Sequence, residues 1–206
     1  MADLADRPPL ILASGSPYRR KMLHDAGLAF EVIPAAVDEA ALKRDFATRM
    51  PKPAPSAIAD GLARAKAEAV SQAHPRALVI GADQILALGD ELLDKPGTDA
   101  AVRLQLERLR GKTHWLISAV ALAEAGKIVW SHTEEAVLTM RSFSPEFLDH
   151  YLAQSGSRVR DIVGAYEIEG PGIQLFERVA GDHFTIIGLP LVPLLAALRA
   201  RGAIAT

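Results

Sequence analysis

The sequence predicts a mixed β-sheet covered by helices, that is, an α/β or α+β fold. Apolar runs of strand length alternate along the chain with segments of helical periodicity. Two tight turns, Gly89-Asp90 and Gly126-Lys127, each separate a pair of apolar runs, which is typical of a β-hairpin. The alternation and the hairpins together imply a sheet with more than one kind of strand pairing.

The expected strands are apolar runs bounded by glycine, proline or polar turn residues. In chain order they are Pro9–Ala13, Phe30–Ile33, Ala77–Ala82 continuing to Leu88, Glu91–Leu93, Trp115–Ala123, Ile128–Val137 and His183–Ile187. The segment Val159–Ile168, which contains Gly164, fits either a strand or a loop.

The expected helices begin at a capping residue or a proline, or follow an apolar period of 3.6 residues. In chain order they are Pro17–Ala26, Ser56–Gln72, Thr98–Leu109, Ser144–Gly156, a short Pro171–Val179 and Pro190–Arg201. The polar, proline-rich stretch Met50–Pro55 is expected to be a loop.

The composition is that of an ordinary globular protein. The chain has 206 residues, of which 50% are hydrophobic and 23% charged, and we expect a single domain over residues 1–206. The net charge of −2 argues against a nucleic-acid polymer as partner, because such proteins usually present a basic face, but a mononucleotide needs only a few cations. Because there are no cysteines, disulfides, thiol catalysis and cysteine-based metal sites are excluded.

The sequence predicts neither a targeting segment nor a membrane span. The N-terminus carries acidic residues, and its apolar run Leu10–Ala13 is too short for a signal peptide. The apolar C-terminal run Phe184–Leu198 is interrupted by Pro190 and Pro193 and falls short of the roughly 20 residues that a span needs. We therefore expect a cytoplasmic protein with no membrane partner.

Several common catalytic motifs are missing. Arg110-Gly111-Lys112-Thr113 ends like a phosphate-binding P-loop, but Leu106 stands where that pattern needs glycine, and a strand rather than a helix follows. The histidines lack metal-ligand spacing, and no Gly-x-Ser-x-Gly turn occurs. P-loop, zinc-hydrolase and serine-hydrolase chemistry are therefore not expected.

The first expected helix begins with charges of unusual sign. Ser16 suits the N-cap and Pro17 the first helical position, but Arg19, Arg20 and Lys21 follow at once. Each cation at a helix N-terminus costs roughly 0.3–1 kcal/mol, because the helix dipole is positive there. Either these are solvated surface charges, or an anion such as phosphate binds where loop N–H groups and arginines converge.

Other charged residues allow two interpretations each. Asp83 interrupts a very apolar strand, either as a structural carboxylate or as a base or metal ligand at a strand end. Lys66, in an Ala-rich helix, and Lys95, in a proline turn, are each typical of exposed lysines when taken alone. Glu39, one of an acid pair, is typical of a helix start, and Glu169 of a solvated strand edge.

In combination, these segments resemble the Maf family of nucleoside triphosphate pyrophosphatases, over Leu10 to Leu198. The order and spacing of the matching segments make coincidence improbable. They are Leu12-Ala13-Ser14-Gly15-Ser16-Pro17-Tyr18-Arg19-Arg20, Val37-Asp38-Glu39, Ala63-Arg64-Ala65-Lys66-Ala67, Gly81-Ala82-Asp83-Gln84, Lys95-Pro96, Leu109-Arg110-Gly111-Lys112-Thr113-His114, Gly164-Ala165-Tyr166-Glu167-Ile168-Glu169-Gly170 and Gly188-Leu189-Pro190-Leu191.

The resemblance implies an elongated mixed sheet flanked by helices, with two lobes around a cleft, as in the inosine triphosphate pyrophosphatases. It implies hydrolysis of a nucleoside triphosphate to the monophosphate and pyrophosphate with a divalent cation, Mg²⁺ or Mn²⁺, which would limit the incorporation of noncanonical nucleotides. Homodimers are common in the family. The implied roles are general base for Asp83, metal-side carboxylate for Glu39, and triphosphate binding for Ser14, Ser16, Arg19, Lys66 and Lys95.

Three positions bear on the base. Family members that act on dTTP and UTP typically carry Arg, Thr and Gln where this chain has Tyr18, Gln84 and Glu169. Members that act on 7-methyl-GTP have an aromatic residue, Gln and Glu there, so the resemblance favours that subtype. An aromatic face also attracts the cationic 7-methylguanine ring by roughly 0.5–2 kcal/mol. A dTTP/UTP or broad-range pyrophosphatase, and a nucleotide-binding regulator of cell division, remain the alternatives.

Overall fold

The computed structural model describes residues 7–49 and 54–205. Within this part the chain divides into two compact units. We call them the first unit, from Met1–Asp83, Ser118–Glu134 and Gly188–Thr206, and the second unit, from Gln84–Ile117 and Glu135–Ile187. Three strands contribute residues to both units: β3 (Leu78–Leu88), β5 (Thr113–Glu124) and β6 (Lys127–Met140).

The strands form one mixed sheet of the order β2-β1-β3-β5-β6-β7, and β4 pairs with β3. The pairs β1–β2 and β1–β3 are parallel, whereas β3–β4 and β6–β7 are antiparallel. The predicted mixed sheet flanked by helices is therefore confirmed. The remaining strands are β1 (Leu10–Leu12), β2 (Glu31–Val32), β4 (Glu91–Leu93) and β7 (Phe176–Ala180).

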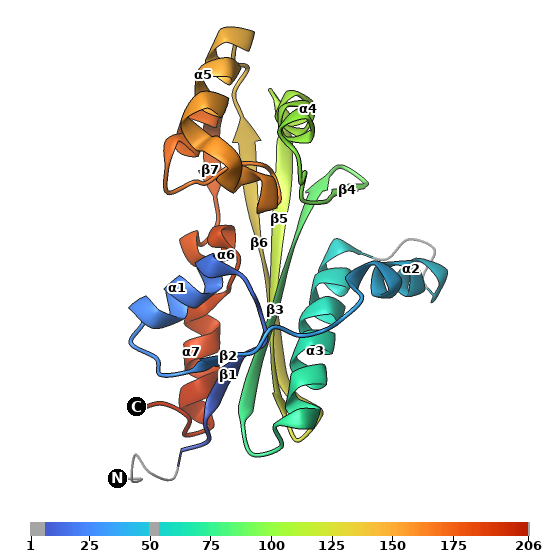
Figure 1. Cartoon of the computed structure of the whole chain (residues 1–206), viewed down its shortest axis with the longest axis vertical. Helices are drawn as coiled ribbons and strands as arrows, with labels where there is room; N and C mark the ends of the chain where they lie inside the picture. The colour runs from blue at the N-terminus through green and yellow to red at the C-terminus, as the bar shows by residue number, and fades with distance from the viewer. Residues whose placement is uncertain (1–6, 50–53, 206) are drawn as a thin grey trace. The chain divides into compact units, whose positions relative to one another are not determined.

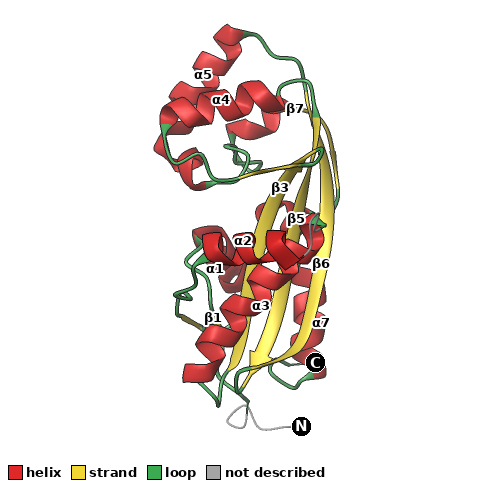
Figure 2. Cartoon of the chain, turned by 90° about the vertical axis from the view of Figure 1, so that its right-hand side faces the viewer, coloured by secondary structure: helices red, strands yellow, loops and turns green. Residues whose placement is uncertain are grey.

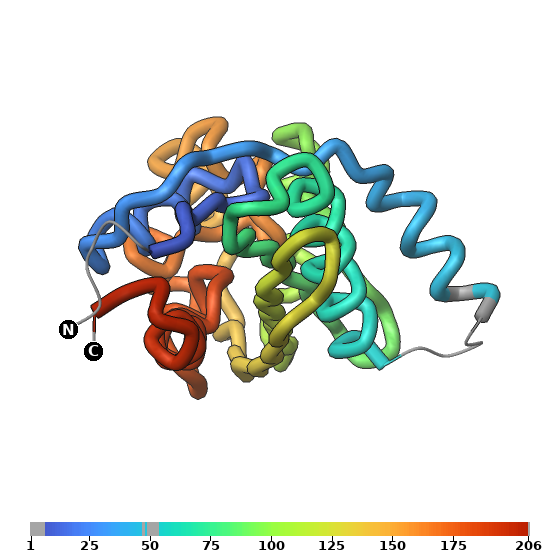
Figure 3. Tube along the Cα trace, turned by 90° about the horizontal axis from the view of Figure 1, so that it is seen from below, coloured from blue at the N-terminus to red at the C-terminus, as the bar shows by residue number. Residues whose placement is uncertain are grey.

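The first unit has helices on both faces of its strands. Figures 1 and 3 show α3 on one side of β1 and β3 and helices α1 and α7 on the other, and α2 packs against α3. Side chains of β1, β3 and α3 meet in a small buried cluster that includes Ile11, Val70 and Val79. The helices are α1 (Pro17–Asp25), α2 (Glu39–Arg49), α3 (Pro55–Ala73) and α7 (Leu191–Ala200).

The second unit has a core of its own. In Figure 2, helices α4 and α5 lie on one side of its strands. Leu106 and Tyr151 of these helices are buried in the core with Leu116 and Leu138 of the sheet, and burying each such leucine contributes about 1.5–3 kcal/mol. Its helices are α4 (Asp99–Leu109), α5 (Pro145–Ser155), the short α6 (His183–Ile187) and the 3₁₀ turns η2 (Gly156–Asp161) and η3 (Pro171–Leu175).

The last third of the second unit differs from the sequence prediction. His183–Ile187 was predicted as a strand but is helix α6, because the Asp182 carboxylate accepts from the backbone N–H of Thr185 at 3.0 Å and starts a helical turn. The predicted helix Pro171–Val179 is helical only to Leu175, since the residues that follow pair with β6.

Two further segments bear on the predictions. Val159–Ile168, which fitted a strand or a loop, is a 3₁₀ turn up to Asp161 and irregular beyond it. No helix was predicted over residues 40–49, but the interpretation of Glu39 as a helix-start carboxylate is correct, because helix α2 begins at Glu39. Within the predicted loop Met50–Pro55, residues 50–53 lie outside the described residues. Among the described helices, none combines the length and the hydropathy needed to cross a membrane.

Candidate active site

The loop between β1 and α1 is held by serine hydroxyls. Ser16 is the N-cap of α1, and its Oγ accepts from the backbone N–H of Arg19 at 3.4 Å. Ser14 is buried, and its Oγ accepts from the backbone N–H of Ser16 at 3.3 Å. Pro17 takes the first helical position, as predicted. These hydrogen bonds fix the loop that leads from the end of β1 into α1.

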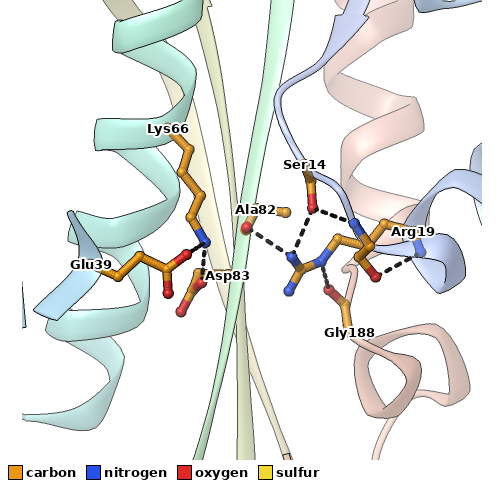
Figure 4. Close-up of polar contacts among 8 residues, drawn as sticks. Ser14, Arg19, Glu39, Lys66, Ala82, Asp83 and Gly188 are labelled. Carbon is orange, nitrogen blue, oxygen red and sulfur yellow. Dashed lines mark hydrogen bonds and ion pairs between the residues drawn. The ribbon is translucent and has the colours of Figure 1, made fainter. Parts of the chain in front are cut away.

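The Arg19 side chain is fixed by three neutral acceptors (Figure 4). Its Nε donates to the carbonyl of Gly188 at 2.8 Å, and its Nη1 donates to the carbonyl of Ala82 at 3.0 Å and to Ser14 Oγ at 3.2 Å. Its second amino group, Nη2, donates to no acceptor among the described residues. Burial lowers the pKa of Arg19 from its ordinary value, and the negative charges of Asp83 and Glu39, which raise it, offset only part of this effect. The guanidinium is thus a preoriented cation with two donors to spare.

The three cations of the first helix therefore have different roles. The interpretation as solvated surface charge is wrong for Arg19, which lies among backbone carbonyls. It is correct for Arg20, which is exposed, and for Lys21, which pairs with Asp25 on the surface of the same helix. Of the three cations at the helix start, only Arg19 is therefore a candidate to bind an anion.

On the other side of β3, Asp83 forms a buried ion pair with Lys66 of α3 (Figure 4). Lys66 Nζ lies 2.6 Å from Asp83 Oδ1, and the two residues are only 8% and 7% exposed. The expectation of an exposed helical lysine, drawn from Lys66 taken alone, is therefore wrong. An unpaired carboxylate at this depth would cost several kcal/mol, so the ammonium makes its burial tolerable.

Gly81 explains why helix and strand approach so closely. A Cβ atom at Gly81 would lie 2.2 Å from the carbonyl oxygen of Ala63 and 2.6 Å from the backbone N of Ala67, both on α3. Only glycine fits such a contact, and it lets Lys66, between these two positions, reach Asp83. Sequence reasoning did not single out Gly81, although a glycine inside a strand pattern is a recognised signal of close backbone approach.

Glu39, at the start of α2, completes this group. Its Oε1 lies 2.8 Å from Lys66 Nζ, and about half of its side chain is exposed. The cluster of Glu39, Lys66 and Asp83 thus has two carboxylates around one ammonium and a net negative charge. It lies across β3 from Arg19, whose acceptor Ala82 is the residue before Asp83.

The two carboxylates suit a hard divalent cation only if the substrate supplies further ligands. Among the residues in the described ranges, no three His, Cys, Asp or Glu side chains gather as a metal site would require. Mg²⁺ is commonly bound by one or two carboxylates together with substrate phosphates, and Glu39 and Asp83 provide that set of oxygens. The donor set therefore fits a cation that arrives with a phosphorylated ligand.

The other predicted site residues are spread over both units. Tyr18 is half-buried in the first unit, next to Arg19 on α1. Lys95 belongs to the second unit and is exposed in the loop between β4 and α4. The structure therefore brings together Ser14, Ser16 and Arg19 around one loop, and Glu39, Lys66 and Asp83 in one cluster.

Gln84 and Glu169 both belong to the second unit. The Nε2 group of Gln84 donates to the carbonyls of Thr185 and Ile186 in α6, at 3.1 and 3.0 Å. Glu169 lies in a turn rather than on a strand edge, about half exposed, with His183 Nε2 3.6 Å from its Oε1. Sequence reasoning missed these α6 partners, because a backbone carbonyl leaves no mark in a sequence.

Comparison with known proteins is consistent with this architecture. Residues 9–201 match the model of the family described as Maf-like protein. A protein of Rhizobium johnstonii named 7-methyl-GTP pyrophosphatase is 49% identical over 197 residues, 96% of this chain and 98% of its own length. A protein of the same name from Mesorhizobium japonicum is 50% identical over 195 residues, 95% of this chain and 97% of its own length.

A third relative carries a broader name. A protein of Paramagnetospirillum magneticum named nucleoside triphosphate pyrophosphatase is 53% identical over 192 residues, 93% of this chain and 98% of its own length. The family match and these three relatives each cover nearly the whole chain. The protein therefore belongs to the Maf family.

Proposed function

We propose that this protein hydrolyses a nucleoside triphosphate to the monophosphate and pyrophosphate, with a divalent cation. The observation that carries the proposal is the pairing across β3 of an arginine with spare donors and a buried carboxylate held by a lysine. The names of the relatives support the same reaction. We further propose that residues 1–206 act as one domain. A homodimer and a cytoplasmic location stay predictions.

The charges suit a triphosphate. This group carries about four negative charges, and attack at the α-phosphorus requires them to be neutralised. Arg19 offers the two N–H groups of Nη2, and Lys66 can move its ammonium from a carboxylate to a phosphate oxygen. Ser14, Ser16 and Lys95 are the other residues that we propose to bind the triphosphate, and Ser14 Oγ also accepts from Arg19 Nη1.

Asp83 is the candidate base. A water oxygen forms a bond to the α-phosphorus, the bond from that phosphorus to the α–β bridging oxygen breaks, and pyrophosphate leaves. The proton of the water passes to the Asp83 carboxylate, whose Oδ1 is held by Lys66 while Oδ2 makes no hydrogen bond to a described residue. Glu39 would hold the divalent cation, which would supply charge neutralisation at the phosphates.

We propose 7-methyl-GTP as the preferred substrate class, and dTTP/UTP or a broad range as the second candidate. Tyr18 offers an aromatic face to a cationic base, and Glu169 a carboxylate to the guanine edge. The Nε2 group of Gln84 donates to two carbonyls of α6, so in this proposal Gln84 acts on the base pocket by holding that helix. The combined changes Tyr18→Arg, Gln84→Thr and Glu169→Gln should shift the preference toward pyrimidines.

The decisive experiment measures pyrophosphate release from dTTP, UTP, CTP, GTP and 7-methyl-GTP with Mg²⁺ or Mn²⁺. We expect release that is lost in Asp83→Asn and retained in Asp90→Asn, an exposed carboxylate in the β3–β4 turn that serves as the matched control. No release from any nucleotide would refute the proposed reaction. Faster release from dTTP or UTP than from 7-methyl-GTP would refute the proposed substrate class alone.

A further inference from the structure

The loop that carries Lys95 has little packing of its own. It runs from Asp94 to Thr98 between β4 and α4, and four of its five residues are exposed. Gly97 has a φ of +72°, and a Cβ atom there would meet nothing within 4 Å. Lys95 itself makes no hydrogen bond to a described residue. Hydrogen bonds from outside the loop must therefore set where the Lys95 backbone lies.

Gln105 of α4 holds the start of the loop, where its side-chain amide donates to the Asp94 carbonyl at 3.2 Å, and Arg160 of η2 holds the other end. Its carbonyl accepts from the Gly97 backbone N–H at 2.9 Å, which fixes the loop two residues after Lys95. Its guanidinium donates through Nε to Asp99 Oδ1 and through Nη2 to Asp99 Oδ2, both at 2.5 Å. The contact is a bidentate fork onto the first residue of α4, the most directional geometry that arginine offers.

The anchor is itself held by the core. Val159, the residue before Arg160, is 1% exposed and belongs to the core of the second unit. The hydrogen bonds from Arg160 also hold the pKa of Asp99 below its ordinary value. A chain of contacts therefore runs from the core through η2 and Arg160 to Asp99 and the loop that contains Lys95. The whole chain of contacts lies within the second unit.

We propose that the Arg160 side chain is a positioning residue, which holds the Asp94–Thr98 loop so that Lys95 meets the phosphates of the substrate. The inference rests on the proposed function, in which Lys95 binds the triphosphate. Arg160 touches no phosphate in this scheme. It acts through Asp99 and the loop.

A purely stabilising role is the competing explanation, and the chain offers a matched control for it. Arg103, on the same helix α4, forms exposed ion pairs with Asp149 of α5 and Glu107 of α4, and among the described residues it has no hydrogen bond or ion pair to the loop. The side chains of Arg103 and Arg160 are 40% and 39% exposed. Exposed pairs of this kind contribute little to stability, so Arg160→Ala and Arg103→Ala should unfold at similar temperatures.

The test is a double-mutant cycle on pyrophosphate release by the full chain. We expect Lys95→Ala to lower kcat/KM by about tenfold or more and Arg160→Ala by about three- to tenfold, whereas Arg103→Ala stays within about twofold of the wild type. In the Lys95→Ala background, Arg160→Ala should cause no further loss, because the residue it positions is already gone.

Each other outcome overturns the inference. It fails if Arg160→Ala behaves like Arg103→Ala, if its effect is as large without Lys95 as with it, or if Lys95→Ala is fully active. In these three cases the wild type still releases pyrophosphate, so the proposed reaction stands. A wild type that releases no pyrophosphate removes the proposed function, and the inference with it.

Discussion

Lowering the pH should weaken the second unit through one buried histidine, His114 of β5. Its ring is 0% exposed, its Nε2 lies 2.7 Å from the hydroxyl of Tyr166, and its Nδ1 has no hydrogen-bond partner among the described residues. Protonation would put a charge, with an N–H that has no acceptor, into an apolar core. Burial accordingly lowers the pKa of His114 from 6.5 to about 4.

The sign and size of the effect follow from these values. Between pH 6.5 and 4 the unfolded chain binds a proton that the folded chain does not, so stability falls as the pH falls through this window. The difference of about 2.5 between the two pKa values corresponds to about 3 kcal/mol when the loss is complete. About 2 kcal/mol of it should be lost by pH 5, where most carboxylates are still ionised.

The assay is urea unfolding at pH 7.5 and pH 5, followed by the fluorescence of Trp115, in the same strand, and Trp130, in β6, with His114→Gln as the control. Glutamine keeps a polar group toward Tyr166 but does not titrate. Between these pH values the wild type should lose about 2 kcal/mol more unfolding free energy than the variant. An equal loss in both proteins would refute the assignment of the effect to His114.

Three further predictions concern the candidate site. Lys66→Met should destabilise the protein by about 3–5 kcal/mol in chemical denaturation, because Asp83 stays buried without its counter-ion. Adding Asp83→Asn should restore much of the lost stability. If the double variant is no more stable than Lys66→Met, the pairing of Lys66 with Asp83 is contradicted. Gly81→Ala should lower the free energy of unfolding by about 1–3 kcal/mol and also lower kcat, because the new methyl group pushes α3 away from β3. Full activity would show that Lys66 does not need the close approach of α3 to β3. Arg19→Lys should lower kcat/KM for pyrophosphate release about a hundredfold, because one ammonium cannot replace a guanidinium bonded to three acceptors. A loss of less than threefold would argue against phosphate binding by Arg19.

Much of the fold was predictable because its signals are local. The N-caps Ser16, Thr98 and Ser144 each accept the backbone hydrogen bond that their position implies. The Gly89-Asp90 turn joins two antiparallel strands as expected, with Leu88 opposite Glu91. Such features depend on a few neighbouring residues, so a single sequence contains them.

The errors lie where distant contacts decide between helix and strand. The apolar composition of His183–Ile187 suits a strand, but the Asp182 cap and the hydrogen bonds from Gln84 belong to a helix. Val179 and its neighbours form a strand because β6 offers an edge to pair with. Gln84 and β6 are far from these segments in the sequence, so periodicity alone could not identify these states, whereas the Asp182 cap is a local signal that the sequence prediction missed.

For the candidate site, the sequence by itself determined which residues we propose to carry the chemistry, because its resemblance to the Maf family singles out Arg19, Lys66 and Asp83 together. Taken one at a time, these residues suggested surface charges and a structural carboxylate. Only the tertiary structure decided that Lys66 is buried against Asp83 and that Arg19 is bonded to Gly188. The physical reason is that burial and pairing arise from segments far apart in the chain, which meet only when the sheet has formed.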